Sequence, residues 1–427
     1  MKQYLVKKSS IKGEIAIPPS KSQTLRAILF ASMANGKSII HSALPSPDAK
    51  AMVEACRTLG ATVDYYYDHI AVDGLNGQID SAEDVIHAGN SGIVLRFIAA
   101  IASLGKHPIV ITGDHSIRHQ RPMKPLLSAL TQLGVKAIST KDDGFAPIII
   151  QGPLTSGTAS VLGEDSQHVS ALLIAAAFAK GPIEIFVENP GEKPWIDLTL
   201  HWFNLLGIPY ENHGYTRYRI PGDSRFAGFQ YTVPGDLSSA SFPIAAALIT
   251  DSDLTLRNVN LNDPQGDKKL IEVLQQMGAK IDIDAKQKTL HIHSGSKLQG
   301  TTVDINDFVD AIAILAVIGC YAEGETKIIN AGVAKQKECD RIRCIALELT
   351  KMGASIEENP DGLTVRKSTL YGADLFSYHD HRMVMSLAVA GLGARGETII
   401  NDVECVSKTY PTFLNDFQSL GAEIFLL

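Results

Sequence analysis

Cysteine is scarce in this 427-residue sequence: the five residues Cys56, Cys320, Cys339, Cys344 and Cys405 are odd in number and form no CxxC pair. We therefore expect neither a disulfide framework nor a zinc site of the usual cysteine spacing. Free thiols persist in a reducing compartment, so the cysteine usage predicts a cytoplasmic protein.

Long apolar runs are missing as well. A stretch such as 311–320 has about ten apolar residues, whereas a membrane-spanning helix needs about 20. Charged residues interrupt the N-terminal sequence MKQYLVKKSSIKGEIAIPP where a signal peptide needs an apolar core. We expect a soluble protein without a targeting segment. The net charge of -7 favours neither nucleic acid nor membrane, and any anion site must come from locally concentrated Lys and Arg.

A six-fold internal repeat is the main positive feature. A phrase of Leu or Met followed by Gly recurs at intervals of 74, 73, 71, 75 and 68 residues. Its glycines follow amphipathic segments and precede alternating ones, which predicts a helix end followed by a strand. The six glycines are Gly60, Gly134, Gly207, Gly278, Gly353 and Gly421.

A second phrase, an Ala-rich apolar segment with a polar start, recurs in the same rhythm. The two phrases together predict an α/β module, strand-helix-strand-helix-strand, of about 70 residues. Because the first helix of each module is apolar all round, it should lie buried at the centre of a domain of three modules. A parallel solenoid is the alternative, although its repeats are typically about 20–50 residues long. The copies begin near Lys21, Asn90, Ser166, Ser238, Asp310 and His381.

The predicted helix starts combine hydrogen-bonding and basic residues. N-capping explains Ser20, Ser91, Asp165, Asp236 and Asp380, and we also expect it of Asp307 together with Asp310. Capping does not call for Lys or Arg, yet basic residues recur at these starts and before the second helices. Several helix N-termini and cations together predict a substrate with more than one anionic group. The cations are Lys21, Arg118, Arg121, Lys124, Lys193, Lys335, Lys337, Arg341, Arg382 and Lys408.

The sequence contains partial matches to nucleotide-binding and metal-binding motifs, but none of them is complete. The segment 35–38 (NGKS) has Ala31 where a phosphate-binding loop needs its first Gly. The segment 391–396 fits the dinucleotide fingerprint by letter but follows a helix and precedes a strand. The pairs His291 with His293 and His379 with His381 have no evident third metal ligand. We expect no cofactor and no metal.

Ten phrases in one order resemble the 5-enolpyruvylshikimate-3-phosphate (EPSP) synthase family, in a divergent bacterial branch. The resemblance implies two inside-out α/β barrels of three modules each, with the active site in a cleft between them. It places a donor-side domain at 1–19 with 236–427, an acceptor-side domain at 20–235, and crossovers near 19 and 235. The phrases are Ser20-Lys21-Ser22, Gly89-Asn90-Ser91-Gly92, Arg121-Pro122-Met123, Ser166-Gln167, Lys193-Pro194, Gly235-Asp236, Gln265-Gly266-Asp267, Lys337-Glu338-Cys339-Asp340-Arg341, Asp380-His381-Arg382-Met383 and Lys408-Thr409-Tyr410-Pro411.

The resemblance also implies the site residues. Phosphoenolpyruvate would be held by Lys21, Gly92, Arg121, Gln167, Arg341, Arg382 and Lys408. Shikimate 3-phosphate would be held by Lys21, Ser22, Arg26, Asp165, Ser166, Gln167, Asp310 and Lys337. The chain departs from the family pattern at Leu25, Ile93, Asp165, Glu192, Trp195 and Val333. Carboxylates near an acceptor phosphate would weaken its binding unless they are paired or turned away.

The activity so implied is transfer of the enolpyruvyl group to the 5-hydroxyl of shikimate 3-phosphate, with release of phosphate, on the route to chorismate. Asp310 would be the base, and Glu338 and Lys21 would transfer protons at the methylene carbon. The chain would act as a monomer without nucleic acid, membrane, metal or cofactor. An enolpyruvyl transferase with another acceptor and a non-catalytic anion-binding paralogue are the alternatives. The related enzyme of peptidoglycan synthesis usually has a Cys in the corresponding region, whereas this sequence has no Cys between Cys56 and Cys320.

Overall fold

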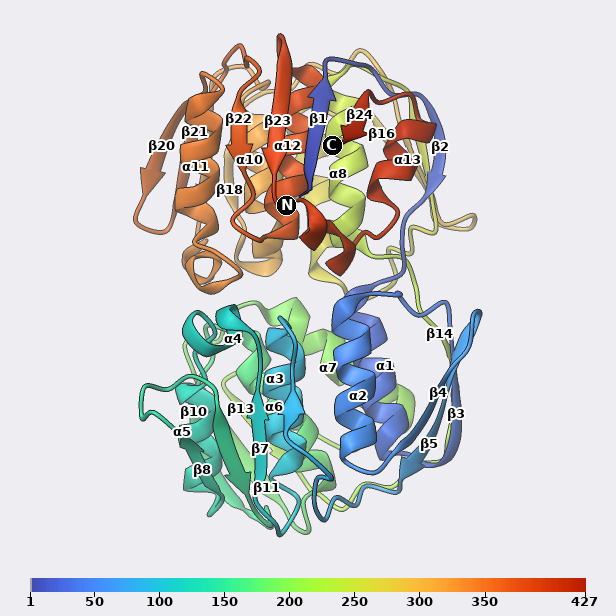
Figure 1. The fold of residues 1–427 in the computed structure, drawn as a ribbon, viewed down its shortest axis with the longest axis vertical. Coiled ribbons are helices and arrows are strands. Elements are labelled where there is room, and N and C mark those ends of the chain that lie inside the picture. Colours follow the sequence, from blue (N-terminus) through green and yellow to red (C-terminus); the bar gives the residue numbers. More distant parts are fainter. Residues whose placement is uncertain (1) are drawn as a thin grey trace. The chain divides into compact units, whose positions relative to one another are not determined.

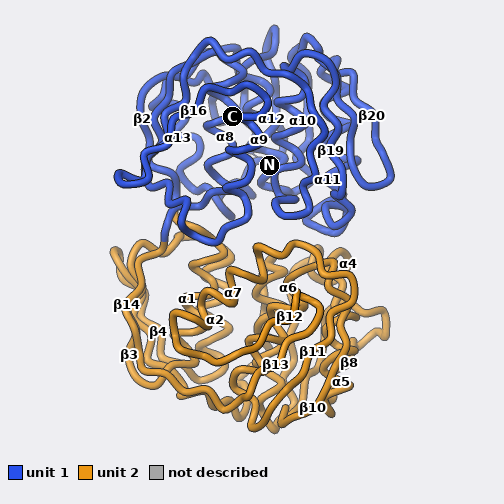
Figure 2. The backbone as a smooth tube through the Cα atoms, turned by 180° about the vertical axis from the view of Figure 1, so that it is seen from behind, with its two compact units in different colours: residues 1–18, 234–427 blue, residues 19–233 orange. Residues whose placement is uncertain are grey.

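The chain divides into two compact units in a computed structural model that describes residues 2–427. Unit 2 is the continuous segment Pro19–Val233, and unit 1 joins the residues up to Pro18 with Pro234–Leu427. Figure 1 shows the elements of both units, and Figure 2 colours unit 1 blue and unit 2 orange. No helix within residues 2–427 has the length and apolar character that a bilayer crossing requires.

Unit 2 contains three four-stranded sheets, in the orders β14-β3-β5-β4, β6-β7-β9-β8 and β10-β11-β13-β12. Its strands are β3 Asn35–His41, β4 Thr62–Tyr65, β5 His69–Leu75, β6 Ile86–His87, β7 Ile109–Thr112, β8 Lys136–Ser139, β9 Ile148–Gln151, β10 Gly157–Leu162, β11 Ile183–Glu188, β12 Glu211–His213, β13 Arg217–Ile220 and β14 Gln230–Thr232. Its helices are α1 Lys21–Met33, α2 Pro47–Thr58, α3 Gly92–Ala102, α4 His115–His119, α5 Lys124–Gln132, α6 Ser166–Phe178 and α7 Lys193–Leu206.

Unit 1 has the same plan, with sheets β16-β17-β15-β2, β18-β19-β21-β20 and β22-β23-β1-β24. Its strands are β1 Gln3–Lys7, β2 Gly13–Ala16, β15 Leu254–Arg257, β16 Ile281–Asp284, β17 Thr289–Ile292, β18 Thr302–Asp304, β19 Glu325–Ile329, β20 Ser355–Asn359, β21 Gly362–Arg366, β22 Asp374–Phe376, β23 Glu397–Asn401 and β24 Ile424–Leu426. Its α-helices are α8 Leu237–Ile249, α9 Lys269–Gln276, α10 Ile312–Gly319, α11 Arg341–Lys351, α12 His381–Gly393 and α13 Phe413–Ser419, and its 3-10 helices are η1 Gly266–Lys268, η2 Asn306–Ala311, η3 Gly332–Gln336 and η4 Glu404–Lys408.

The module is richer by one strand than the predicted strand-helix-strand-helix-strand unit. In the second module, for example, β6 pairs parallel with β7, and the hairpin β8–β9 then adds two antiparallel strands. The alternating residues after each second helix therefore form two strands instead of one. In β16–β17 the turn contains Lys288 at φ 54°, a conformation that breaks a strand.

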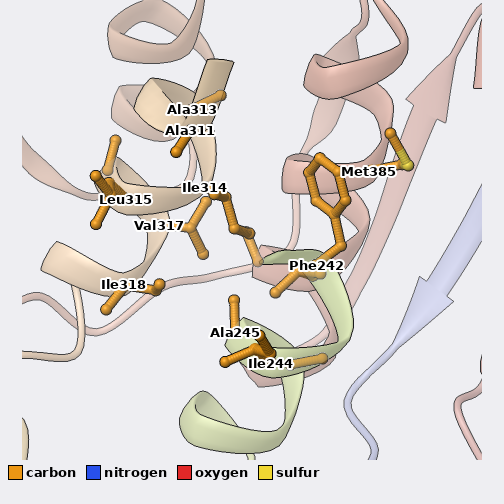
Figure 3. Packing of buried hydrophobic residues seen from close by; sticks show 14 of the residues in the cluster. Phe242, Ile244, Ala245, Ala311, Ala313, Ile314, Leu315, Val317, Ile318 and Met385 are labelled. Atoms are coloured by element: carbon orange, nitrogen blue, oxygen red, sulfur yellow. The ribbon is translucent and has the colours of Figure 1, made fainter. Parts of the chain in front are cut away.

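Apolar helices occupy the centre of each unit, as predicted. In unit 1, α8, α10 and α12 contact one another pairwise, and Figure 3 shows Phe242, Ile314 and Met385 among the side chains they bury. In unit 2, α3 packs on α6, and nearly every residue of α1 is buried as well. Helices that are apolar all round have no solvent face, so sheets and outer helices must enclose them.

All six glycines of the repeated phrase have positive φ, from 68° at Gly207 to 104° at Gly60. Glycine reaches this region without a Cβ clash, so each one can end a helix and turn the chain toward the next strand. The interpretation of these six positions as helix ends is confirmed.

Candidate functional site

Five of the six central helices begin with a side-chain cap, as the sequence predicts. In unit 2 the caps are Ser20, Ser91 and Asp165, which accept hydrogen bonds from the first turns of α1, α3 and α6. In unit 1 they are Asp236 and Asp380, at the starts of α8 and α12. Such caps satisfy amide groups that the helix itself leaves without partners.

The sixth start, that of α10, corrects the capping prediction made for Asp307 and Asp310. No side chain caps η2 or α10, and Phe308 interrupts η2 with φ -146° and ψ 46°. Asp307 instead pairs with Lys269 at 3.0 Å on the surface. Asp310 does not cap a helix; its carboxylate binds side chains of the neighbouring helices α11 and α12.

Asp310 lies between two arginines of unit 1. Its Oδ1 accepts a hydrogen bond from Arg341 Nη1 at 2.6 Å, and its Oδ2 accepts one from Arg382 Nη2 at 2.7 Å. The Asp310 side chain is 19% exposed, whereas both arginine side chains are at most 5% exposed. Two cations at these distances hold the carboxylate ionised, which is the state of a general base.

Glu338 joins a third cation to the same cluster. One of its oxygens accepts from Arg341 Nη2 and the other from Lys408 Nζ, each at 2.7 Å. Asp380, besides capping α12, accepts from Arg341 Nε at 2.7 Å. Arg341 thus bonds three carboxylates while it is 1% exposed. Lys337, adjacent to Glu338, is also buried.

The charge of Arg341 is secured by these partners. Burial by itself would lower the pKa of Arg341, but Asp380, Glu338 and Asp310 together raise that pKa well above its ordinary value. The guanidinium is therefore positive at every pH at which the protein is folded.

In unit 2, Lys21 begins α1 and lies 3.8 Å from the carboxylate of Asp48, in the first turn of α2. The same Asp48 oxygen accepts a hydrogen bond from the Ser91 hydroxyl at 2.9 Å. Asp48 therefore links the starts of α1 and α3. We did not predict a role for it, and the only signal was its place after Ser46 and Pro47 at a helix start.

Gly92, Gln167 and Arg121 come together around Arg96. A Cβ added to Gly92 would lie 2.9 Å from Arg96 Nη1, 3.4 Å from Gln167 Oε1 and 3.8 Å from Arg121 Cδ. Arg96 Nη1 donates to Gln167 Oε1 at 2.7 Å. Any side chain at position 92 would separate these groups, which accounts for the glycine. We predicted no role for Arg96 from the sequence.

The remaining predicted residues of unit 2 lie near the starts of α1, α6 and α7. Arg26 donates to Thr199 Oγ1 from Nε and Nη2, at 3.1 and 2.9 Å, and its guanidinium lies over the Phe97 ring at 5.1 Å. Ser22 is buried in the first turn of α1. Ser166 gives hydrogen bonds from its amide and its hydroxyl to Glu192 Oε2, at 3.1 and 3.0 Å.

Both unexpected carboxylates of unit 2 have partners inside the unit. Asp165 caps the Gln167 amide and lies 3.2 Å from Arg96 Nη2. Glu192, in the left-handed conformation at φ 45°, is buried and bonds Ser166. Their charges are therefore offset by protein groups, as carboxylates close to a phosphate site would need to be.

A group of possible metal ligands, Glu338, Asp380 and His381, lies within the unit 1 cluster. The carboxylates of this group already bind Arg341 and Lys408. A divalent cation would have to displace two positive side chains, so the donor set fits an ion-pair network better than a metal site.

Unit 2 also has a hollow of about 990 Å³ at the opposite helix ends, lined by Leu59, Leu104, Phe178, Lys180 and Arg225 among others. None of the predicted site residues lines it. The predicted residues gather instead at the N-terminal ends of the central helices in both units.

Comparison with known proteins identifies relatives over the whole length. Residues 5–417 match the family model EPSP synthase (3-phosphoshikimate 1-carboxyvinyltransferase). The chain is 44% identical over 419 residues to the 3-phosphoshikimate 1-carboxyvinyltransferase of Acetivibrio thermocellus, covering 98% of both. It is 43% identical to that of Chlamydia abortus, covering 99% of this chain and 95% of the relative. The solved structure of EPSP synthase from Acinetobacter baumannii is similar with a TM-score of 0.83 at 27% identity, covering 100% of each chain.

Proposed function

The chain belongs to the EPSP synthase (3-phosphoshikimate 1-carboxyvinyltransferase) family, and on this premise we propose that the two clusters described above bind and activate its substrates. The activity of the family is transfer of the enolpyruvyl group of phosphoenolpyruvate to shikimate 3-phosphate. The chain is a transferase of the shikimate pathway, which leads to the aromatic amino acids.

The observation that carries the proposal is the position of Asp310 between Arg341 and Arg382. A base for the acceptor hydroxyl must be ionised before the reaction and still reachable by the substrate. The two arginines favour ionisation, and the exposed fifth of the side chain leaves one edge of the carboxylate accessible. Asp310 would take the proton of the 5-hydroxyl as that oxygen attacks.

The cations would hold the donor. Arg341, Arg382 and Lys408 in unit 1, with Lys21 and Arg121 in unit 2, would bind its phosphate and carboxylate. Gly92 and Gln167 would contact the donor beside Arg121. The positive side chains would then stabilise the phosphate as it leaves, because they are fixed by hydrogen bonds before the reaction.

Proton transfer at the methylene carbon falls to Glu338 and Lys21. Protonation of that carbon makes its neighbour electrophilic, the acceptor oxygen adds, and loss of a proton with phosphate restores the enolpyruvyl double bond. Glu338 lies between Arg341 and Lys408, which favours its ionised form. The Lys21 ammonium would therefore give the proton to the methylene carbon, and the Glu338 carboxylate would take a proton from the resulting methyl group as phosphate leaves. No step of this sequence calls for a metal or an organic cofactor.

The acceptor would be shikimate 3-phosphate, held by Lys21, Ser22, Arg26, Asp165, Ser166, Gln167, Asp310 and Lys337. The pairing of Asp165 with Arg96 and of Glu192 with Ser166 supports this assignment, since groups of the protein stabilise both negative charges and so reduce their repulsion of an anionic acceptor. We further infer a cytoplasmic, monomeric enzyme, consistent with five free cysteines. Phosphate release, measured with phosphoenolpyruvate and shikimate 3-phosphate together and with each alone, tests the proposal. Release without the acceptor, or none with both, contradicts it.

A further inference from the structure

Asp267 is a buried carboxylate that the reaction described above does not use. It lies in η1 and is 2% exposed. The Ser238 hydroxyl acts on its carboxylate, yet neither side-chain oxygen has a well-aligned hydrogen bond within residues 2–427. An ionised carboxylate without such bonds is strongly disfavoured inside a protein. Its position therefore needs an explanation.

The loop around Asp267 is held in place and cannot turn the side chain to solvent. Gln265 accepts a hydrogen bond from the Leu237 amide at 2.9 Å and donates to the Gly235 carbonyl at 3.0 Å. Asp263 accepts from the Gln265 amide at 3.2 Å. These bonds fix η1 against the start of α8, and η1 also packs on η2, which carries Asp310.

Several charged groups surround Asp267. Asp310 on η2, Arg382 on α12 and Asp236 before α8 act on it electrostatically. The neighbouring cations point elsewhere, since Lys268 bonds the carbonyls of Leu261 and Asp263 while Lys269 pairs with Asp307. Two other charged groups of these elements are Glu272 on α9 and the buried Asp263.

The balance of these influences favours a protonated acid. Burial raises the pKa of Asp267 most, and the charges of Asp310 and Asp236 raise it further, whereas Arg382 and the Ser238 hydroxyl lower it, with a result of about 7. Arg382 meanwhile donates from Nη1 to Ser238 and from Nη2 to Asp310, whereas its buried Nε has no partner in residues 2–427. An ionised Asp267 could take up that third donor.

We propose that Asp267 is a positioning residue: it carries a proton while Arg382 is paired with Asp310, and its ionisation draws Arg382 away from Asp310 and from the donor phosphate. The inference rests on the proposed function for its effect on catalysis. Asp267 touches no reacting atom in this scheme; it acts on Arg382, and its charge when ionised also acts on Asp310.

The direction of the pH effect follows from the charge. At a pH below the pKa of Asp267, Asp267 is neutral and the full charge of Arg382 is available to bind the donor. At a pH above that pKa, the ionised Asp267 carboxylate, in addition to Asp310, offsets the charge of Arg382, so the KM for phosphoenolpyruvate should rise. In Asp267→Asn, which is isosteric with the protonated acid, that rise should be absent. The ratio of wild-type to variant donor KM should therefore grow about tenfold between pH 6 and pH 8.5, the size of one weakened charge-assisted contact.

Asp263→Asn is the matched control, because it changes a buried carboxylate of the same loop and keeps an oxygen for the Gln265 amide. Its donor KM should follow the wild-type pH dependence. A wild-type to Asp267→Asn ratio that stays constant with pH overturns the proposal. Parallel pH dependences in Asp263→Asn and Asp267→Asn overturn it as well.

A readout independent of turnover separates this inference from the proposed function. The infrared carbonyl-stretch band of a buried carboxylic acid should be present in the wild-type protein at pH 6, fade as the pH passes about 7, and be missing in Asp267→Asn. Its absence from the wild-type spectrum at pH 6 overturns the inference even if phosphate release is normal. Absence of phosphate release with a normal band would instead count against the proposed substrates.

Discussion

The three central helices of unit 2 all begin with a side-chain cap, whereas in unit 1 only α8 and α12 do. The exception, α10, follows the kinked η2 that carries Asp310. Repetition of one module builds the scaffold, and the place where the repeat is broken provides the carboxylate that binds Arg341 and Arg382. The functional asymmetry thus comes from a local backbone change in a symmetric fold.

The polar clusters of the two units differ in the same sense. In unit 1, carboxylates bind the site cations, with Arg341 at the centre of three of them. In unit 2, Asp48 and Asp165 each lie against a single cation, Lys21 and Arg96 respectively. Arg26 donates instead to a threonine hydroxyl and to the Trp195 carbonyl, and Arg96 also donates to the Gln167 amide oxygen. An anion entering unit 1 must compete with internal carboxylates, one of which is the proposed base.

The largest effect on stability should come from Asp380, which both caps α12 and binds Arg341. Asp380→Ala removes the α12 cap and a buried partner of Arg341, so it should lower the free energy of unfolding by about 3 kcal/mol. Ser91→Ala removes a cap in unit 2 whose hydroxyl also donates to Asp48 but bonds no cation, so the loss should be about 1 kcal/mol. Urea unfolding of both variants measures the difference. Equal losses in the free energy of unfolding would mean that the unit 1 cluster contributes no more to stability than the helix start at Ser91.

The uncapped helix gives the second prediction. Asp310→Asn keeps an oxygen for Arg341 but cannot accept the hydroxyl proton, so turnover should fall by about 10²-fold or more while both substrates still bind. Steady-state kinetics together with calorimetric binding separates the two effects. Asp307→Asn, three residues earlier on the same η2, alters only a surface ion pair and should leave turnover unchanged. Near-normal turnover in Asp310→Asn would remove Asp310 from the role of base.

Much of this scaffold could be predicted from the sequence, because its signals are local. The glycines of the repeated phrase specify helix ends, and polar residues before apolar segments specify caps. The α10 start was misread because Asp307 and Asp310 have the right residue type for a cap, and only the backbone turn at Phe308 excludes them. Asp48, Arg96 and Asp267 were missed because their roles depend on contacts between modules, which no local pattern reveals.

The third prediction asks whether both units bind the donor. Arg382→Ala in unit 1 and Arg121→Ala in unit 2 each remove charge-assisted hydrogen bonds worth about 1.5–3 kcal/mol, so each should weaken phosphoenolpyruvate binding roughly 10- to 100-fold. The Arg382 effect should be the larger of the two, since its removal also leaves Asp310 with one cation fewer, and the less compensated carboxylate opposes the anionic donor. Titration of the donor in the presence of the acceptor measures both.

Exposed arginines of the same units serve as controls for these variants. Arg343 on α11 and Arg57 on α2 are both exposed and lie outside the predicted donor residues. Alanine at either position should leave donor affinity within about twofold, because the attraction of a distant surface charge is largely screened by salt. Donor affinity that is unchanged in both Arg382→Ala and Arg121→Ala would contradict the assignment of the donor site to these two residues.

The smallest effect concerns the carboxylate that departs from the family pattern in unit 2. Glu192→Gln keeps an oxygen for the Ser166 amide and hydroxyl, but the hydrogen bonds lose their charge, so the free energy of unfolding should fall by about 1 kcal/mol. If the Glu192 charge is offset inside the unit, the KM for shikimate 3-phosphate should change less than about threefold. A large fall in that KM would show that Glu192 repels the acceptor phosphate. The acceptor-side cluster would then resemble that of unit 1, where an internal carboxylate opposes the incoming anion, and the contrast between the two units would be lost.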